Sequence, residues 1–237
     1  MTPGFDFSAI RALSFDCYGT LIDWETGLLR ALQPLLQKAN VSIEAALSAY
    51  AESEAREEAR TPGKRYPLIL EAVYRVLAQK WNVPVTDADV KAFGASVPLW
   101  PPFADSSAAL KRLQSRFKLC ILSNVDHESF AGTERALNVN FDLIVTAQDV
   151  GTYKPNLKNF RTLLDRVIDM DIAPHQVLHV AESLFHDHVP AQRLNLKTCW
   201  IDRRKGKGGG ASAAKPVSVT PHLTFYSLAE LADAAGV

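Results

Sequence analysis

Short apolar segments that alternate with segments of helical periodicity constrain the fold of this chain more than any other feature. The segments that resemble buried strands are residues 10–15, 119–122, 143–145, 177–181 and 198–201. The segments with apolar residues three and four positions apart are residues 106–117, 130–137, 157–167 and 189–194. Strands that alternate with helices form a parallel sheet, and strands that are apolar throughout belong to a sheet covered on both faces. We therefore predict an α/β fold with a doubly wound, Rossmann-like parallel sheet as its core.

The segment after the first strand breaks this alternation. Residues 28–36, 43–60 and 67–81 all have helical periodicity, and no strand-like segment separates them. A proline-rich stretch at residues 98–102 then leads back to the alternating pattern, and its prolines favour a stiff connection. We predict an all-helical cap of residues 24–97, inserted into a core domain of residues 1–23 and 98–237. Residues 205–215, rich in Gly, Ala and Lys, are expected to form a surface loop.

The composition excludes several classes of partner. Lys+Arg and Asp+Glu are equal at 26 each among 237 residues, whereas nucleic acids and anionic membranes select proteins with a basic excess. No apolar segment approaches the roughly 20 residues that cross a bilayer, and the N-terminal residues lack a signal-peptide pattern. Cys17, Cys120 and Cys199 are expected to be reduced core thiols. These features predict a cytoplasmic protein that binds neither nucleic acid nor membranes.

Polar side chains follow the predicted strands. In chain order they are Asp16, Ser123 with Asn124, Lys154, and Glu182 with Asp187. Ligands of doubly wound proteins bind outside the carboxyl ends of the strands. A strand-final aspartate or a Ser-Asn pair alone is commonly structural, but several sets in this order predict one shared active site.

The same positions resemble the motifs of the haloacid dehalogenase superfamily. The matching segments are Phe15-Asp16-Cys17-Tyr18-Gly19-Thr20-Leu21, Leu122-Ser123-Asn124, Tyr153-Lys154-Pro155 and residues 182–187. The resemblance covers essentially the whole chain, the cap included. It implies a hydrolase in which Asp16 is the nucleophile and forms a covalent aspartyl intermediate. Such a nucleophile divides one difficult displacement into ester formation and ester hydrolysis.

The resemblance and the chemistry of the residues assign the other catalytic roles. Lys154 is expected to keep Asp16 anionic and aligned, and to contact a carboxylate of the substrate. Ser123 and Asn124 are expected to donate hydrogen bonds to that carboxylate or to the leaving group. Asp187 is expected to orient Lys154 or to help position the hydrolytic water.

The residue two positions after Asp16 separates two reaction classes. Superfamily phosphatases have an aspartate there, which protonates the leaving alcohol, whereas this chain has Tyr18, and a phenol with a pKa of about 10 is a poor acid. Asp-x-Tyr-Gly-Thr resembles the type II 2-haloacid dehalogenase branch. That branch attacks the α-carbon of a small 2-substituted carboxylic acid and needs neither a general acid nor magnesium. The resemblance implies no cofactor; a magnesium-dependent small-molecule phosphatase is the alternative.

Two departures from the branch leave the leaving group open. The branch has an arginine early in the cap, and none stands at the matching place. The nearest candidates are Arg56, which lies among several glutamates and is expected to form a surface pair on its helix, and Arg65. The fourth motif has Glu182, Leu184 and His186 where dehalogenases have small polar residues, an asparagine and a tryptophan. An acidic Glu182 close to the motif's aspartate also suits a magnesium site.

Residues 16–27, 146–151 and 181–188 resemble members of the branch that hydrolyse L-azetidine-2-carboxylate, in which the ring amine leaves from C2. The missing arginine, together with Glu182, His186 and His188, suits a leaving amine better than a halide. An amine must be protonated to leave, and His186 is the candidate acid because its pKa lies near neutrality. The residues expected to bind the substrate are Tyr18, Trp24, Glu182, Ser183 and His186. The expected substrate is thus a small carboxylic acid, a 2-haloacid or L-azetidine-2-carboxylate. Relatives are often dimers, so a homodimer is the expected assembly.

Overall fold

The structure is a computed structural model, and it describes residues 5–206 and 218–237. Its described residues form a six-stranded sheet with the strand order β3-β2-β1-β4-β5-β6, in which every pairing is parallel. The strands are β1 (Ala12–Phe15), β2 (Lys118–Ser123), β3 (Leu143–Thr146), β4 (Val177–Ala181), β5 (Lys197–Ile201) and β6 (Leu223–Phe225). The predicted doubly wound parallel fold is confirmed. Residues 207–215 of the predicted loop lie outside the described residues.

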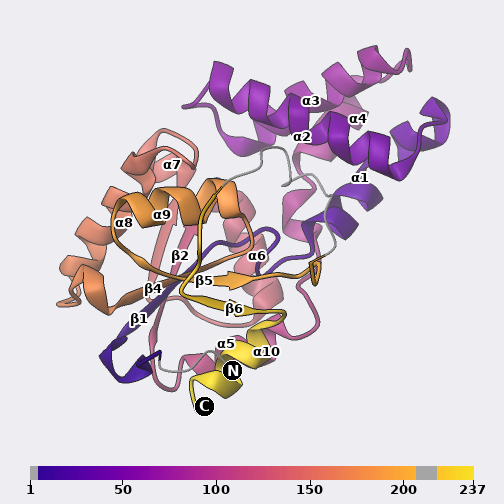
Figure 1. Cartoon of the computed structure of the whole chain (residues 1–237). Helices are drawn as coiled ribbons and strands as arrows, with labels where there is room; N and C mark the ends of the chain where they lie inside the picture. The colour runs from indigo at the N-terminus through magenta and orange to yellow at the C-terminus, as the bar shows by residue number, and fades with distance from the viewer. Residues whose placement is uncertain (1–4, 207–217) are drawn as a thin grey trace.

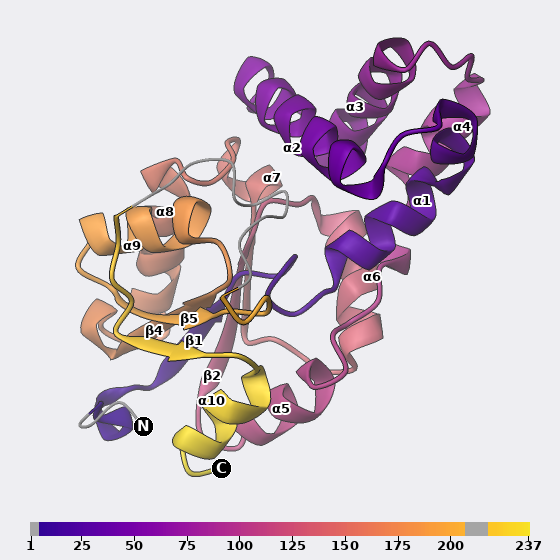
Figure 2. The ribbon, with the colours of Figure 1, turned by 45° about the vertical axis from the view of Figure 1, so that its right-hand side comes forward.

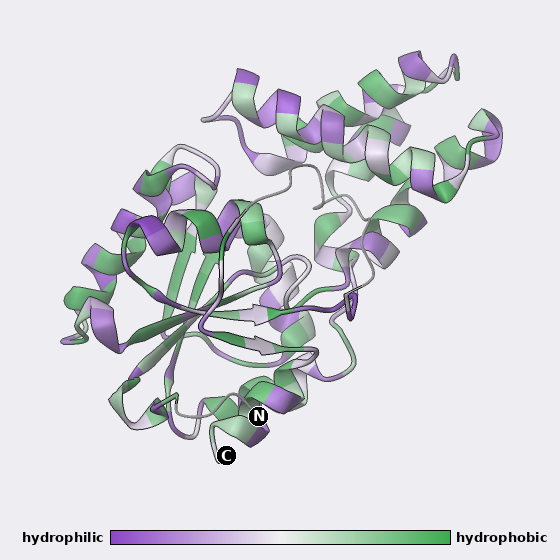
Figure 3. Cartoon of the chain, in the orientation of Figure 1, coloured by the Kyte–Doolittle hydropathy of each residue, from purple (hydrophilic) through white to green (hydrophobic). Residues whose placement is uncertain are grey.

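Helices cover both faces of the sheet, as Figures 1 and 2 show. One face packs against α5 (Ser106–Leu113), α6 (His127–Leu137) and α10 (Leu228–Ala234), and the other against α8 (Leu157–Ile168) and α9 (Val189–Arg193). Successive residues of a strand point to opposite faces, so Leu13 and Phe15 join the first core while Ala12 joins the second. Because both faces are buried, most residues of the central strands β1 and β4 are hydrophobic, whereas β5 and β6, nearer the edge, carry more polar residues (Figure 3).

Short helical segments complete the core. The four-residue helix α7 (Ala147–Val150) follows β3 directly, and single turns form η1 (Phe7–Ala9), η2 (Val97–Leu99) and η3 (Pro174–Gln176). The segment after β4 is a π-helical turn, η4 (Leu184–His188). The order of the strands places β1 between β2 and β4, so the chain reverses its direction of winding at β1. A ligand crevice is expected outside the carboxyl ends of these central strands.

The cap consists of α1 (Trp24–Ala39), α2 (Ile43–Arg60), α3 (Tyr66–Lys80) and α4 (Asp87–Gly94). These helices lie together beyond the carboxyl end of β1, to one side of the sheet (Figure 1). The side chain of Asp23 caps α1 and that of Ser42 caps α2. All four helices fall within the predicted residues 24–97, whose limits as a separate domain stay a prediction. Within the described residues, each helix is too short or too polar to span a bilayer.

Sequence periodicity found most elements but not all. The five predicted strands are present, each end within two residues of its predicted position. Strand β6 was missed because it has only three residues, and α4 was missed because it has only eight and a weakly apolar sequence. Both are held in place by packing: β6 pairs with β5, and α4 packs mainly against α3.

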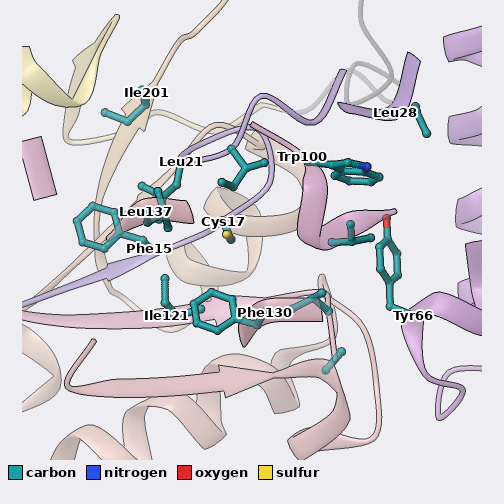
Figure 4. Close-up of a cluster of buried hydrophobic side chains, with 14 of the residues drawn as sticks. Phe15, Cys17, Leu21, Leu28, Tyr66, Trp100, Ile121, Phe130, Leu137 and Ile201 are labelled. Carbon is teal, nitrogen blue, oxygen red and sulfur yellow. The ribbon is translucent and has the colours of Figure 1, made fainter. Parts of the chain in front are cut away.

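One close contact joins the cap to the core. Gly27 in α1 lies against the ring of Trp100, and a Cβ atom at Gly27 would be 2.3 Å from Cγ of Trp100. Trp100 is only 3% exposed and belongs to the core cluster drawn in Figure 4. The ring therefore has little room to move, and only a glycine fits at this position.

Gly27→Ala is expected to destabilise the protein by about 1–3 kcal/mol, the usual cost of overpacking a core. This cost exceeds the gain of up to about 1 kcal/mol that alanine brings to a helix. Urea denaturation measures the difference. Gly63→Ala is the control, because a Cβ atom there meets only one backbone oxygen, at 3.9 Å. Equal stability of the two variants would contradict the predicted clash.

Candidate active site

Asp16 lies directly after β1, at the centre of the sheet's carboxyl edge. Its backbone N–H donates to the carbonyl of Val180 at 3.0 Å, which holds it in line with β4. Its Oδ1 accepts a hydrogen bond from Nζ of Lys154 at 2.8 Å, and its Oδ2 accepts one from Oγ1 of Thr20 at 2.7 Å. Burial raises the pKa of Asp16, and the charge of Lys154 opposes that rise. The carboxylate is thus held at both oxygens, and its side chain is 9% exposed.

Lys154 uses all its donors inside the protein. Besides Asp16, its Nζ donates to Oδ1 of Asp187 at 2.6 Å and to the carbonyl of Leu122 at 3.0 Å. An ammonium has three N–H donors, so this arrangement leaves none for the predicted contact with a substrate carboxylate. Burial alone would lower the pKa of Lys154, but the two carboxylates raise it above its ordinary value. Lys154 is therefore a permanent cation that holds two buried anions.

Asn124 and Ser123 follow β2, beside Lys154. The amide of Asn124 donates to the carbonyl of Lys154 at 3.2 Å and accepts from the backbone N–H of Lys154 at 2.6 Å. This pair of bonds fixes the loop that carries the lysine. Oγ of Ser123 is buried and has no hydrogen-bond partner among the residues that the structure describes. The predicted hydrogen bond from Ser123 to a bound molecule stays a prediction, whereas the amide of Asn124 mainly positions Lys154.

Asp187, in η4, is held by two donors on the same oxygen. Its Oδ1 accepts from Lys154 and from Nε2 of His179 at 3.0 Å, and Nδ1 of His179 in turn lies 2.8 Å from Oγ of Ser14. Burial favours the neutral acid, but Lys154 and His179 outweigh it and lower the pKa of Asp187 well below its usual range. The sequence analysis missed His179. Its signal was a single polar residue inside the apolar strand β4.

We expect His179→Leu to destabilise the protein by about 1–3 kcal/mol, because it removes a hydrogen bond to a buried carboxylate and leaves Oγ of Ser14 without a hydrogen-bond partner. His179→Gln, which keeps a donor near the position of Nε2, is expected to recover part of this loss. Urea denaturation of the three proteins at neutral pH measures both effects. If the leucine variant matched the wild type, His179 would not be supporting Asp187.

A cavity of about 180 Å³ opens between the core and the cap above Asp16. Its lining residues from the core are Asp16, Tyr18, Trp100, Asn124, Lys154, Glu182, Ser183, Phe185, His186 and Asp187, and those from the cap helices α1, α2 and α3 are Trp24, Ala51, Glu54, Ala55, Glu58 and Tyr66. Every predicted site residue except Ser123 is in this set. A larger open depression of about 1140 Å³ lies near the amino ends of β1, β2 and β3 and contains none of the motifs. The cavity is the candidate active site, and it is small.

Tyr18 is placed as a wall and not as an acid. Its hydroxyl lies 2.9 Å from Oγ1 of Thr133, and its ring meets that of Trp100 edge to face, with centroids 5.6 Å apart. Burial raises the pKa of Tyr18 well above its ordinary value. A phenol in this environment holds its proton tightly, so it cannot replace the aspartate that phosphatases use at this position.

His186 and Ser183 form a local pair at the cavity wall. Oγ of Ser183 accepts the backbone N–H of His186 at 3.1 Å and lies 3.2 Å from Nδ1 of its ring. The hydroxyl of Ser183 can donate to Nδ1 or accept from it, and the tautomer of His186 decides the direction. The ring of His186 lines the cavity. The neighbouring His188 is buried and bonded to the carbonyl of Ala181 at 3.0 Å, and burial lowers its pKa to about 4.

The structure places neither candidate arginine of the cap in the cavity. Arg56 forms an exposed ion pair with Glu52 at 2.7 Å, which confirms the predicted surface pair, and Arg65 pairs with Glu128 at 2.9 Å. Glu54 and Glu58 line the cavity instead. The sequence analysis missed these two because it took the acidic run around Arg56 as a solvated surface. Their spacing was the available signal, since positions 51, 54, 55 and 58 share one face of a helix.

Comparisons with known proteins show the family and the fold of this chain. A family model for haloacid dehalogenase-like hydrolases matches residues 10–184. The chain belongs to this family. The haloacid dehalogenase-like hydrolase shares its fold with the L-2-haloacid dehalogenase PA0810, with a TM-score of 0.80, 20% identity and coverage of 95% of this chain and 99% of that one. It also matches the L-2-haloacid dehalogenase from Xanthobacter autotrophicus with chloropropionic acid covalently bound, with a TM-score of 0.76, 14% identity and coverage of 94% and 97%.

A curated relative of this haloacid dehalogenase-like hydrolase points to another activity. The chain is 24% identical over 160 residues to the pyrimidine 5′-nucleotidase YjjG of Escherichia coli (strain K12). The match spans 65% of each chain, which is slightly less than two thirds of the nucleotidase. The comparisons therefore establish the family and the hydrolase class, but not the substrate.

Proposed function

We propose that this hydrolase displaces a leaving group from C2 of a small 2-substituted carboxylic acid, a 2-haloacid or L-azetidine-2-carboxylate. A carboxylate oxygen of Asp16 forms a bond to C2 while the bond from C2 to the leaving group breaks, which gives an aspartyl ester. Water then adds to the carbonyl carbon of that ester, the ester bond opens, and a 2-hydroxy acid leaves. The second step regenerates the carboxylate of Asp16.

One observation carries this proposal: Asp16 is held by Lys154 and Thr20 in a small, enclosed cavity whose neighbouring wall is Tyr18. A nucleophile held at both oxygens is aligned for displacement. Displacement at carbon needs no acid two residues later, and Tyr18 is not one. The covalently bound chloropropionic acid of the Xanthobacter autotrophicus enzyme, which has the same fold, supports the same class of reaction.

The cavity wall suits a leaving amine better than a leaving halide. Glu182 and His186 line the cavity, and either side chain can pass a proton to or from a ring nitrogen. Opening of L-azetidine-2-carboxylate adds one water in total and yields 4-amino-2-hydroxybutyrate, so the proton given to the nitrogen is returned when water attacks the ester. A halide, in contrast, leaves as an anion into a wall that contains Glu182.

The test combines two substrates with isotope labelling. The enzyme is incubated in excess over L-azetidine-2-carboxylate or 2-chloropropionate in heavy-oxygen water, and the peptide that contains Asp16 is analysed by mass spectrometry. We expect one heavy oxygen in Asp16 after a single turnover, with amino-hydroxybutyrate or chloride as the product. Heavy oxygen in the product and none in Asp16 would show direct attack by water and overturn the proposal.

A magnesium-dependent phosphatase is the second candidate, because the curated relative is a 5′-nucleotidase. The residues present do not fit the ion well. The ammonium of Lys154 lies between the carboxylates of Asp16 and Asp187, and the described residues contain no group of three His, Cys, Asp or Glu side chains placed for a metal. Hydrolysis of p-nitrophenyl phosphate that EDTA abolishes, with no turnover of either acid, would establish this candidate in place of the first.

A further inference from the structure

The cavity holds an excess of acidic groups. Its lining contains the carboxyl groups of Asp16, Glu54, Glu58, Glu182 and Asp187, and among the described residues that line it Lys154 is the only lysine or arginine. Nζ of Lys154 is already bonded to Asp16 and Asp187. The cap side of the cavity is therefore acidic without a basic side chain among its lining residues. A small carboxylic acid with no positive charge would meet repulsion there.

Glu54 is built into this wall by two tyrosines. The hydroxyl of Tyr50 donates to Oε1 of Glu54 at 2.6 Å, and the hydroxyl of Tyr66, from α3, donates to the same oxygen at 2.5 Å. Both tyrosines are buried, with 0% and 7% exposure. Two donors on one oxygen stabilise the anionic form of a carboxylate, and they fix its direction. Oε2 of Glu54 accepts no hydrogen bond from the described residues, so it is available to a molecule in the cavity.

Glu58 lies one helical turn further along the same face of α2 and has no hydrogen-bonding or ionic partner among the described residues. Burial, with repulsion from Glu54, raises its pKa well above the ordinary value. A cation between the two carboxylates would relieve both effects. A second, independent feature lies on the core side of the same cavity: Oδ2 of Asp187, a residue only 1% exposed, also lacks a hydrogen-bond partner among the described residues. Carboxylate oxygens without a hydrogen-bond donor from the described residues thus occur on the cap wall and at Asp187.

We propose that Glu54, oriented by Tyr50 and Tyr66 and assisted by Glu58, binds a protonated amine of the substrate. The cavity then selects an amino acid, whose ammonium group faces α2, over a 2-substituted acid that lacks nitrogen. This inference rests on the proposed function for the position of the attacked carbon. It names specificity residues in the cap that share no contact with Asp16.

The proposal separates substrates by charge and not by shape. An ammonium gains a charge-assisted hydrogen bond to Glu54, whereas a methylene group at the same place leaves Oε2 buried without a partner. L-Proline and cyclopentanecarboxylate differ in this one respect, because both carry a carboxylate on a five-membered ring. Neither probe carries a halide or a strained ring, so their binding is measured without requiring turnover.

Isothermal titration calorimetry of the wild type with these two probes is the test. We expect L-proline to bind at least about tenfold more tightly than cyclopentanecarboxylate, the effect of one hydrogen bond to a charged group. Glu54→Gln, which keeps the size of the side chain and an acceptor for the tyrosines, is expected to reduce this ratio to near one. Tyr66→Phe, which removes one of the two donors, is expected to reduce it partly. Glu52→Gln, on the exposed side of the same helix, is the control and is expected to keep the wild-type ratio.

Equal binding of the two probes by the wild type, or no binding of L-proline, overturns the inference without any variant. A wild-type ratio in folded Glu54→Gln protein also overturns it. The labelling of Asp16 with heavy oxygen is an independent measurement. Labelling of Asp16 without a preference for L-proline would support the proposed function and contradict the amine site. A preference for L-proline without labelling of Asp16 would support the amine site and contradict the proposed function.

Discussion

Replacing Lys154 with methionine is expected to abolish hydrolysis and to lower the free energy of unfolding by about 3–5 kcal/mol, the usual cost of removing one partner from a buried ionic group. Lys154 is 3% exposed and bonds two carboxylates, those of Asp16 and Asp187, at 2.8 Å and 2.6 Å. Without the ammonium, two buried anions face each other. Activity is lost because Asp16 is then neither aligned nor kept ionised.

The measurements are turnover and urea denaturation at neutral pH. Lys118→Met is the control, because Lys118 forms an exposed ion pair with Asp142 at 2.7 Å and such pairs contribute about 0–1 kcal/mol. A Lys154→Met variant that was as stable as the control would show that the buried carboxylates need no cation.

The pH dependence of this variant has a definite sign. In the wild type, Lys154 and His179 lower the pKa of Asp187, so Asp187 adds stability that is present at neutral pH and is lost only as the pH falls through its depressed folded-state pKa. In Lys154→Met the main cause of that depression is gone, and burial raises the pKa. The folded state then takes up a proton before the unfolded state does. The variant is therefore expected to become more stable, relative to the wild type, as the pH falls from neutrality toward the ordinary carboxyl pKa of about 4.

Asp16→Asn is expected to reduce turnover by about 10⁴-fold or more, the scale seen when a nucleophile is removed from a catalytic group that acts as a unit. The amide keeps the size of the side chain and an oxygen for Lys154 or Thr20, so the variant is expected to fold. Steady-state turnover of the better of the two acids measures the loss. Substantial activity in the variant would show that a group other than Asp16 attacks the substrate.

Asp23→Asn is the matched control for this variant. Asp23 is seven residues further on and caps α1 by accepting the backbone N–H of Thr26 at 3.1 Å. Asparagine caps helices about as well as aspartate, so the control is expected to keep its activity within about twofold. A comparable loss in both variants would indicate a general disturbance of the connection between the core and the cap.

The sequence was a good guide wherever a pattern is local. The alternation of strands and helices predicted the parallel sheet, because strands buried on both faces must be apolar at every position. The strand-final positions of Asp16, Ser123 and Asn124 predicted a common edge, because the carboxyl ends of parallel strands share one edge. The missed elements, β6 and α4, are short, and their stability comes from neighbours that lie elsewhere in the chain.

The composition of the cavity could not be predicted in the same way. Glu54 and Glu58 stand in an acidic run in which Glu52 is exposed and Glu57 is buried and paired with Arg60. Only the position of α2 in the fold shows which of these glutamates face the cavity. The sequence suggested that Lys154 could contact the substrate. The fold, however, brings Asp187 and the carbonyl of Leu122 to the two N–H donors of Lys154 that do not bond Asp16. His179 gained its role because β4 lies next to β1, which brings Ser14 within reach of its ring.

The fold class and the hydrolase family thus followed from the sequence, and Asp16 could be predicted as the nucleophile, since each depends on residue types at fixed short spacings. Which charges face the cavity became clear only from the packing of separate elements. This packing gives every N–H donor of Lys154 an acceptor within the protein, and it turns the hydroxyl of Tyr18 toward Thr133. It also places Glu54 and Glu58 in the same cavity as Asp16. The physical reason is that a local pattern records which side chains share a face of one element. The charge of a cavity depends on how separate elements pack, and no spacing along the chain records that.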